Sequence, residues 1–291
     1  MGRRVRAAVQ ALSARLIAAA AALISAAALP ASPALATSAV AACAQPVYLT
    51  FDTGHMGVAP LVAEVLRRHE VKVTFFLANE RTIEGGSSLD ERWAPWWRER
   101  VAEGHAFASH TWDHWVLQEP APGSTGGAGG FRFKATQGPR RGQVFVEEAP
   151  AYCEQLRRPA ARLQEMTGAT MAAAFRAPAG RTSPALLKAA RACGFEHVGW
   201  SPAGFLGDEL DSRRFPNEQL LHKALREIRA GDVLVAHLGI WDRQDPWAPA
   251  VLEPLITGLK ARGLCFRTLR EHPRHAAAFS GAAPVRGLAE R

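Results

Sequence analysis

Several kinds of motif are missing from this sequence, and each absence excludes a class of protein. None of the four cysteines forms a Cys-x-x-Cys pair, so a cysteine zinc site is not expected. No Gly-x-Ser-x-Gly turn occurs, which disfavours a serine hydrolase. No cluster of Lys and Arg with interleaved aromatic residues occurs either, so nucleic-acid binding is not indicated. The glycine-rich run at 123–130 lacks the Gly-Lys-Ser/Thr ending of a phosphate loop.

The apolar run from Leu16 to Leu29 is shorter than the roughly 20 residues of a membrane span. Four arginines precede it, and Ala34-Leu35-Ala36 offers a small-x-small cleavage site. This layout is typical of a secretory signal peptide. We therefore expect removal of residues 1–36, export to the periplasm or the medium, and no stable membrane span after processing. An uncleaved N-terminal anchor is the alternative. The four arginines account for half of the formal net charge of +8.

Cys43 has two interpretations. The sequence Val40-Ala41-Ala42-Cys43 resembles a bacterial lipoprotein processing site, in which the cysteine would carry a lipid anchor. The competing interpretation is a disulfide, because an even number of cysteines in an exported chain suggests one or two bridges. Cys43 and Cys265 flank the first and last predicted strands, which would be neighbours in a closed barrel. Their pairing is the first expectation.

Strands and helices alternate along the chain after the leader. Short β-branched and aromatic runs predict seven strands, at 47–51, 71–76, 105–109, 171–175, 196–200, 232–236 and 264–269. Helical spacing of apolar residues between them predicts parallel strands with helices outside. The number of units favours a distorted (β/α)7 barrel, TIM-barrel-like, over an open sheet. We place this domain at 46–270, with an irregular exposed insertion at 120–142 and a C-terminal tail without regular structure at 271–291.

Residues with chemical functions stand at the C-terminal ends of the predicted strands, which is the functional face of α/β barrels. Asp52 follows the first strand, His110 the third and Arg176 the fourth; Trp200 ends the fifth, and His237 follows the sixth. Random placement would scatter such residues among helices and N-terminal strand ends. The arrangement therefore predicts an active site.

His110 and His114 are four residues apart. On one helical turn their Cβ atoms would be about 5–6 Å apart, which allows both rings to bind one metal ion. An isolated pair with this spacing is usually a coincidence, but this pair follows a strand end beside an acid and another histidine. We predict that it binds a divalent metal.

Five segments resemble, in order, the five motifs of the polysaccharide deacetylase family (NodB homology, carbohydrate esterase family 4). They are Thr50-Phe51-Asp52-Thr53-Gly54, His110-Thr111-x-x-His114, Arg176-Ala177-Pro178-Ala179-Gly180, the Trp200 strand end, and Leu234-Val235-Ala236-His237. The resemblance covers roughly residues 46–269. It implies a distorted seven-unit β/α barrel and metal-dependent removal of acetyl groups from N-acetylated sugars of polysaccharides, including those of cell walls.

The resemblance also implies a role for each matching position. These roles are general base for Asp52, metal ligand for His110 and His114, orientation of Asp52 for Arg176, a wall of the acetyl pocket for Trp200, and general acid for His237. Metal coordination polarises an amide carbonyl and lowers the pKa of water to about 7 for zinc. General acid and base groups each contribute about 10²–10⁴-fold in rate.

The chain departs from the family pattern in three places. Thr53 stands where the family usually has a second aspartate, its third metal ligand, and Ala179 stands where the family usually has an aromatic residue in the substrate site. No acid follows the fourth-motif tryptophan within residues 201–207, although Asp208 is close. His55 could complete a three-histidine site, a set that suits zinc. The alternative is that His55 lines the sugar groove.

Tryptophans after strand ends suit a carbohydrate groove, because flat rings stack on sugar faces. The tryptophans expected to contact sugar are Trp112, Trp115, Trp241 and Trp247. Trp93, Trp96 and Trp97 are expected to pack in the core.

The preferred interpretation is an exported, metal-dependent polysaccharide deacetylase, with zinc as the favoured metal. Two alternatives stay open: a carbohydrate-binding protein that lost catalysis together with its metal aspartate, and a hydrolase of another amide or ester.

Overall fold

The computed structural model describes residues 43–119 and 130–284. The strands are β1 (Pro46–Asp52), β2 (Thr74–Leu77), β3 (Ala106–Ser109), β4 (Trp115–Leu117), β5 (Phe131–Ala135), β6 (Val144–Glu147), β7 (Ala174–Phe175), β8 (Glu196–His197), β9 (Val233–His237) and β10 (Cys265–Phe266). The α-helices are α1 (Ala59–Arg68), α2 (Ala94–Ala102), α3 (Ala149–Thr167), α4 (Pro184–Ala192), α5 (Asn217–Glu227), α6 (Trp247–Ala250), α7 (Leu252–Ala261) and α8 (Ala276–Ser280). Each of the seven predicted strands overlaps an observed one.

The main sheet is parallel and is built around β1. Strand β1 pairs with β9 from Tyr48 to Asp52, with β2 from Thr50 to Asp52 and with β10 at its first two residues. The sheet continues from β2 through β3 and β7 to β8. Beyond β8 the chain returns to β9, where the Ser201 amide donates to the Val233 carbonyl at 3.0 Å and Phe205 bridges Val235. The sheet therefore curves so that its β8 side approaches β9. The predicted distorted (β/α)7 fold is confirmed.

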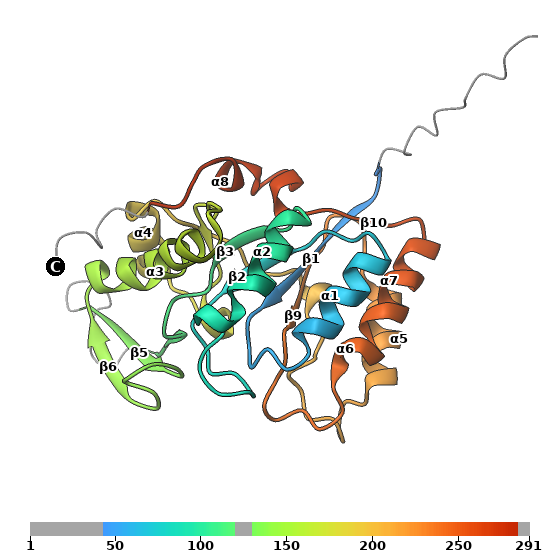
Figure 1. The fold of residues 1–291 in the computed structure, drawn as a ribbon, viewed down its shortest axis with the longest axis horizontal. Coiled ribbons are helices and arrows are strands. Elements are labelled where there is room, and N and C mark those ends of the chain that lie inside the picture. Colours follow the sequence, from blue (N-terminus) through green and yellow to red (C-terminus); the bar gives the residue numbers. More distant parts are fainter. Residues whose placement is uncertain (1–42, 120–129, 285–291) are drawn as a thin grey trace, which may run out of the picture. The chain divides into compact units, whose positions relative to one another are not determined.

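The helices cover the outside of this sheet. In Figure 1, α1, α5 and α7 lie beside β1, β9 and β10, while α2 and α3 lie beside β2 and β3. The helices begin as their sequences predict: proline occupies the first turn of α1, α2, α3 and α4, where its missing amide proton is not needed. Helix α3 ends at Gly168, which adopts a left-handed φ of 74°.

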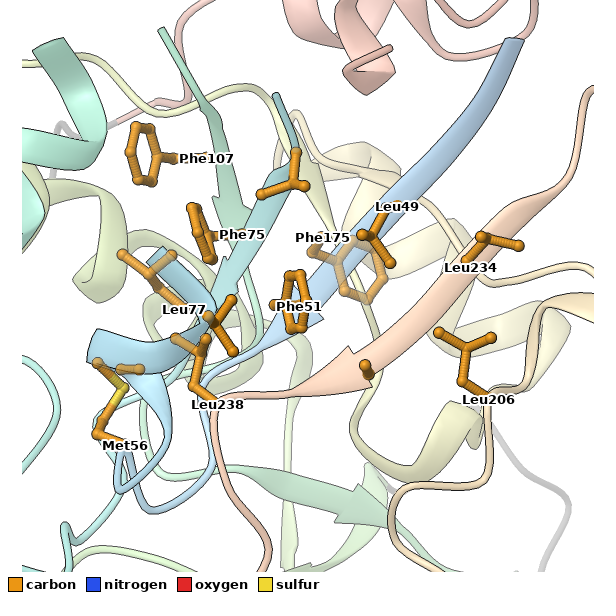
Figure 2. Packing of buried hydrophobic residues seen from close by; sticks show 14 of the residues in the cluster. Leu49, Phe51, Met56, Phe75, Leu77, Phe107, Phe175, Leu206, Leu234 and Leu238 are labelled. Carbon is orange, nitrogen blue, oxygen red and sulfur yellow. The ribbon is translucent and has the colours of Figure 1, made fainter. Parts of the chain in front are cut away.

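Alternation along β1 divides its side chains between two faces. Leu49 and Phe51 pack outward under the helices, together with Phe75 of β2 and Phe175 of β7 (Figure 2). Tyr48 faces inward with a second apolar cluster. Because successive strand side chains point to opposite faces, Thr50 and Asp52 share the inward direction of Tyr48. The sheet therefore presents its apolar groups to the helices and its last polar groups to the interior.

Residues 120–142 were predicted to be an irregular insertion, and this prediction is wrong for 131–135, which form β5. Strands β4, β5 and β6 form a separate antiparallel sheet, in which Phe133 faces Phe145 and Leu117. Phe133 and Ala135 are buried while Arg132 and Lys134 are exposed, which is the period-2 pattern of a half-buried strand. The glycine-rich stretch before it obscured this pattern in the sequence. Residues 120–129 lie outside the described residues.

The C-terminal tail also differs from the expectation. Residues 276–280 form α8, and Phe279 is buried in the inward-facing apolar cluster. The Ala283 amide donates to the Met171 carbonyl at 2.8 Å, which attaches the segment to the barrel. The Ala173 amide also donates to the Ala278 carbonyl at 3.0 Å, so backbone hydrogen bonds and one buried aromatic side chain hold this alanine-rich segment. Residues 1–36 and 285–291 lie outside the described residues, and no helix in the described ranges is long and apolar enough to cross a membrane.

Two disulfides connect distant parts of the chain. The expected Cys43–Cys265 bridge is confirmed, with Cα atoms 5.8 Å apart, and it joins the start of β1 to β10. A second bridge, Cys153–Cys193, connects α3 to the end of α4. The lipid-anchor alternative needs the Cys43 sulfur free, whereas the disulfide engages it.

Replacing Cys43 and Cys265 together by serine is expected to lower the free energy of unfolding by roughly 2–4 kcal/mol, because the bridge restricts the unfolded chain. Urea denaturation followed by circular dichroism measures this change. The double variant Cys153→Ser/Cys193→Ser is the comparison, since its bridge spans 40 residues instead of 222. An unchanged urea midpoint in the Cys43/Cys265 variant would contradict the prediction.

Candidate active site

The strand ends bring the predicted base and acid together. Asp52 is the last residue of β1 and His237 the last residue of β9, and the two are register partners across the parallel pair. His110 follows β3 and Arg176 follows β7 directly, and their backbone amides continue the ladder by donating to Leu77 and Ser109. Each of four strands thus ends with one inward-facing residue of the site. These residues are Asp52, His110, Arg176 and His237, and they converge because the parallel strands end at the same edge of the sheet.

Asp52 is held by a buried ion pair. Arg176 Nη1 lies 2.7 Å from Asp52 Oδ1 and 2.8 Å from Thr50 Oγ1, and both charged side chains are almost fully buried. The same guanidinium donates to the Val198 and Gly199 carbonyls, which fixes its plane. Burial alone would raise the pKa of Asp52, but the charge and hydrogen bond of Arg176, together with the charges of His110 and His237, outweigh burial and hold the pKa below its usual range. Asp52 is therefore ionised at neutral pH.

The two histidines of the second motif do not lie on a helical turn, contrary to the geometry assumed from their spacing. They lie on a tight loop in which Thr111 and His114 have positive φ values of 62° and 49°. This loop still brings the rings together, with centroids 4.8 Å apart. The spacing was a valid signal, but a left-handed turn rather than helical periodicity produces the proximity.

Both rings expose the same nitrogen. His110 Nδ1 lies 3.0 Å from the Arg176 carbonyl and must donate to it, which leaves the lone pair on Nε2. His114 Nδ1 lies 2.6 Å from Thr136 Oγ1, whose own proton goes to the His114 carbonyl, so His114 Nδ1 also donates. Burial lowers the pKa of His110 to about 4, despite the opposing charge of Asp52, so this ring is neutral. A metal-binding histidine typically has this arrangement.

His237 is paired with Asp208. Its Nδ1 lies 3.1 Å from both oxygens of Asp208, and its backbone amide donates to Asp208 Oδ2 at 2.7 Å. Burial alone would lower the pKa of His237, but the charge and hydrogen bond of Asp208 raise it to about 10. Glu209 lies on the other side, 3.8 Å from His237 Nε2. His237 is therefore protonated at neutral pH, as a proton donor must be.

Sequence reasoning missed one acid in this region, Glu80. It lies three residues after β2, and it is 8% exposed. Its Oε1 accepts hydrogen bonds from Thr53 Oγ1 at 2.6 Å and from the Gly54 amide at 2.7 Å. Burial would raise the pKa of Glu80, but His114, Thr53 and His110 together hold it below the usual value. The strand-end rule gives only a weak signal for Glu80, because the other residues end or directly follow their strands.

A cavity of about 160 Å³ opens over these groups. It is lined by Asp52, Glu80, His110, His114, Glu209 and His237, and also by the three predicted substrate contacts Ala179, Trp200 and Trp241. Trp241 is 52% exposed at its edge. Trp115 and Trp247 are buried, so the expectation that they stack on sugar is wrong for these two.

His55 is placed differently from the other predicted ligands. It lines a smaller adjoining cavity with Val58 and Asp208 and is not in the lining of the 160 Å³ cavity. Its Nδ1 accepts a hydrogen bond from the Gly57 amide at 2.9 Å, and its ring packs edge-on against Trp241. Metal ligation by His55 stays a prediction.

The donor set of the larger cavity suits a divalent metal. Imidazole nitrogens and carboxylate oxygens, which His110, His114 and the buried acids of the cavity offer, are the ligand types that zinc prefers. Within residues 43–119 and 130–284, no three His, Cys, Asp or Glu side chains are arranged so that they could together hold a metal ion. The fit therefore rests on the chemistry of these donors.

The chain is similar to known proteins in both sequence and fold. Residues 39–198 match the sequence profile described as polysaccharide deacetylase. The chain belongs to the polysaccharide deacetylase family. A member of this family is a hydrolase, and the resemblance noted from the five motifs is confirmed.

Two curated relatives and one solved structure are similar to this polysaccharide deacetylase. A chitooligosaccharide deacetylase of Azorhizobium caulinodans is 28% identical over 77% of this chain and 92% of its own. A peptidoglycan-N-acetylglucosamine deacetylase of Bacillus cereus is 23% identical over 79% of this chain and 88% of its own. A family 4 acetyl xylan esterase from Clostridium thermocellum, solved with a cobalt ion, shares the fold with a TM-score of 0.57 and 23% identity, covering 78% of this chain and 89% of that one.

In the Asp208→Asn variant the pKa of His237 is expected to fall from about 10 toward the ordinary 6.5, because the neutral amide no longer stabilises the charged ring. Histidine NMR titration measures it. Since the folded pKa exceeds the unfolded value, the pair stabilises the fold fully below about pH 6.5 and loses this effect as the pH rises through about 10. Glu209→Gln, which removes the more distant charge, should shift the pKa less. An unchanged titration in Asp208→Asn would refute the assignment.

Proposed function

We propose that this protein is an exported, metal-dependent deacetylase that removes N-acetyl groups from a polysaccharide or oligosaccharide. The observation that carries this proposal is the placement of Asp52 beside Arg176 and of His237 beside Asp208 on register-paired strand ends that line one cavity. These partners lower the pKa of Asp52 and raise that of His237. Hydrolysis of an amide needs one group to take a proton from water and another to give a proton to the leaving nitrogen. The two residues are in the opposite protonation states that these tasks require.

The surrounding residues keep those states in place. Arg176 holds Asp52 Oδ1 and orients Oδ2 toward the side where His110 Nε2 lies, 3.5 Å away. Asp208 holds His237 by Nδ1, so that Nε2 carries the proton available to a leaving amine. A pure carbohydrate-binding protein would gain nothing from an ionised base and a charged acid buried side by side. This argues against the alternative of a binding protein that has lost catalysis.

His110 and His114 are the residues that would hold a divalent metal, with zinc favoured. A bound metal supplies polarisation of the amide carbonyl and acidification of water. The neutral state of His110 and the outward hydrogen bonds of both Nδ1 atoms support this proposal. The cobalt ion in the Clostridium thermocellum esterase is consistent with it.

The proposed substrate is an N-acetylated glycan. The two curated relatives are named for chitooligosaccharide and for peptidoglycan N-acetylglucosamine, which share the N-acetyl group. In this chain Trp200 and Ala179 border the cavity beside Arg176, where a small acyl group would be placed. The exposed Trp241 offers a flat ring at the rim for a sugar face.

Acetate release from acetylated chito-oligosaccharide and from peptidoglycan tests the activity. Asp52→Asn and His237→Ala are each expected to lower kcat by about 10²–10⁴-fold, because each removes one proton-transfer group. Asp242→Asn and His222→Ala replace exposed residues of the same types and serve as matched controls with wild-type rates. Sugar binding without acetate release by the wild-type protein, with any divalent metal, would favour the binding-protein alternative instead.

Export is supported by the two disulfides, which form in oxidising compartments. Mass spectrometry of the protein from a secreting bacterial host is expected to show a chain that starts at Thr37. Replacing Ala34 and Ala36 by arginine should block this cleavage, because the processing enzyme requires small residues at both positions. A protein found only with its N-terminal 36 residues intact would contradict the proposal.

A further inference from the structure

The third metal ligand of this enzyme is in question, because Thr53 stands where the family resemblance expects an aspartate. We propose that Glu80 supplies that ligand from the neighbouring strand end and that Thr53 positions it. This inference rests on the metal dependence proposed above. It names a residue that lies outside all five motifs of the family.

Glu80 reaches the site because β1 and β2 are neighbours. Asp52 and Phe76 are register partners, so the chain leaving β1 and the chain leaving β2 run side by side. The turn after β1 needs Gly54, whose φ is 63° and whose missing Cβ leaves room for the Gly239 carbonyl. In this conformation the Gly54 amide points at Glu80 Oε1. The backbone of the first motif therefore holds the carboxylate of Glu80.

Thr53 is committed to Glu80 through both of its hydrogen-bonding roles. Its Oγ1 accepts from the Ala78 amide at 3.1 Å and donates to Glu80 Oε1 at 2.6 Å. A hydroxyl used in this way is a poor metal ligand, but it is a good support for one. The family usually has a carboxylate at the position of Thr53. In this chain the carboxylate belongs to Glu80, which accepts a hydrogen bond from Thr53.

The second oxygen of Glu80 has no other partner to satisfy it. Among the described residues, Oε2 accepts no hydrogen bond, and no Lys or Arg forms an ion pair with Glu80. Among these residues Oε2 is also absent from the buried polar atoms that lack a partner, so this oxygen faces the cavity and not the protein interior. The nearby rings of His110 and His114 are the groups that face it in the cavity. A metal ion between these rings and Oε2 would use this oxygen as a ligand without displacing the hydrogen bonds that Oε1 accepts.

The tautomer of the His55 ring favours Glu80 over His55 as the third ligand. The Gly57 amide donates to His55 Nδ1, so in the neutral ring the proton is on Nε2 and no lone pair is free. His110 and His114 have the opposite tautomer, with Nε2 free for a metal. Two histidines and one glutamate are also a set that catalytic zinc sites use, with the fourth position left for water. Closing the three onto one ion needs a change of side-chain torsion, since no closed cluster exists in the described ranges.

Zinc content and zinc affinity of the full processed chain test the inference without relying on activity. Wild-type protein is expected to bind one zinc ion. Glu80→Gln, which keeps the shape and removes the charge, is expected to weaken zinc binding by more than about 100-fold, while Thr53→Val should weaken it by about 10–100-fold as a supporting residue. His55→Gln is the matched control and should leave the affinity unchanged. Circular dichroism confirms that each variant is folded.

X-ray absorption of the zinc-loaded wild-type protein gives an answer that does not depend on any variant folding. The expected signal is two imidazole ligands with oxygen donors, and a signal of three imidazoles would overturn the inference in favour of His55. Unchanged zinc affinity in folded Glu80→Gln would also overturn it. If the wild-type chain releases acetate and binds zinc while Glu80→Gln does so equally well, this inference fails and the proposed function stands. A wild-type chain that binds no divalent metal refutes both the metal dependence and the role of Glu80.

Discussion

The buried ion pair between Arg176 and Asp52 is the interaction on which the rest of the site depends. It joins the end of β7 to the end of β1, and through the Val198 and Gly199 carbonyls it also holds the chain after β8. Removing one partner of such a pair costs about 3–5 kcal/mol, because the remaining charge is left buried and unpaired. The enzyme keeps this pair because it holds the Asp52 carboxylate ionised in a site that excludes most water.

The pKa values of two neighbouring residues are shifted in opposite directions at the C-terminal ends of the strands. Arg176 lowers the pKa of Asp52, and Asp208 raises the pKa of His237, although the two titrating residues are register partners on adjacent strands. Burial by itself opposes both shifts. It also strengthens the attraction of Arg176 to Asp52 and of Asp208 to His237, since charges interact more strongly away from water. A pair of groups whose pKa values are pushed apart in this way is the physical basis for assigning one as base and the other as acid.

With Glu80 as the proposed ligand, Thr53 would illustrate how a site can keep its chemistry while changing its sequence. A motif is read along one strand, but the ligands of a metal are gathered from several. Because β1 and β2 end side by side, a carboxylate on the loop after β2 can occupy the space that a side chain after β1 would otherwise use. Comparison along a single motif suggests that a ligand has been lost, whereas the contacts of Glu80 indicate that one has moved.

The sequence by itself determined the parallel α/β architecture and the strand-end placement of Asp52, His110, Arg176 and His237, whereas the Cys43–Cys265 bridge was only its first expectation until the structure showed it. Local patterns decide these features, because hydrophobic alternation places each strand and the chain direction places its end. Only the tertiary structure decided the partners of those residues. Glu80, Asp208 and Thr136 reach the site from other loops, and the last of these follows a strand that the sequence pattern did not reveal. Protonation states and histidine tautomers follow from such partners, which are close in space and distant in sequence.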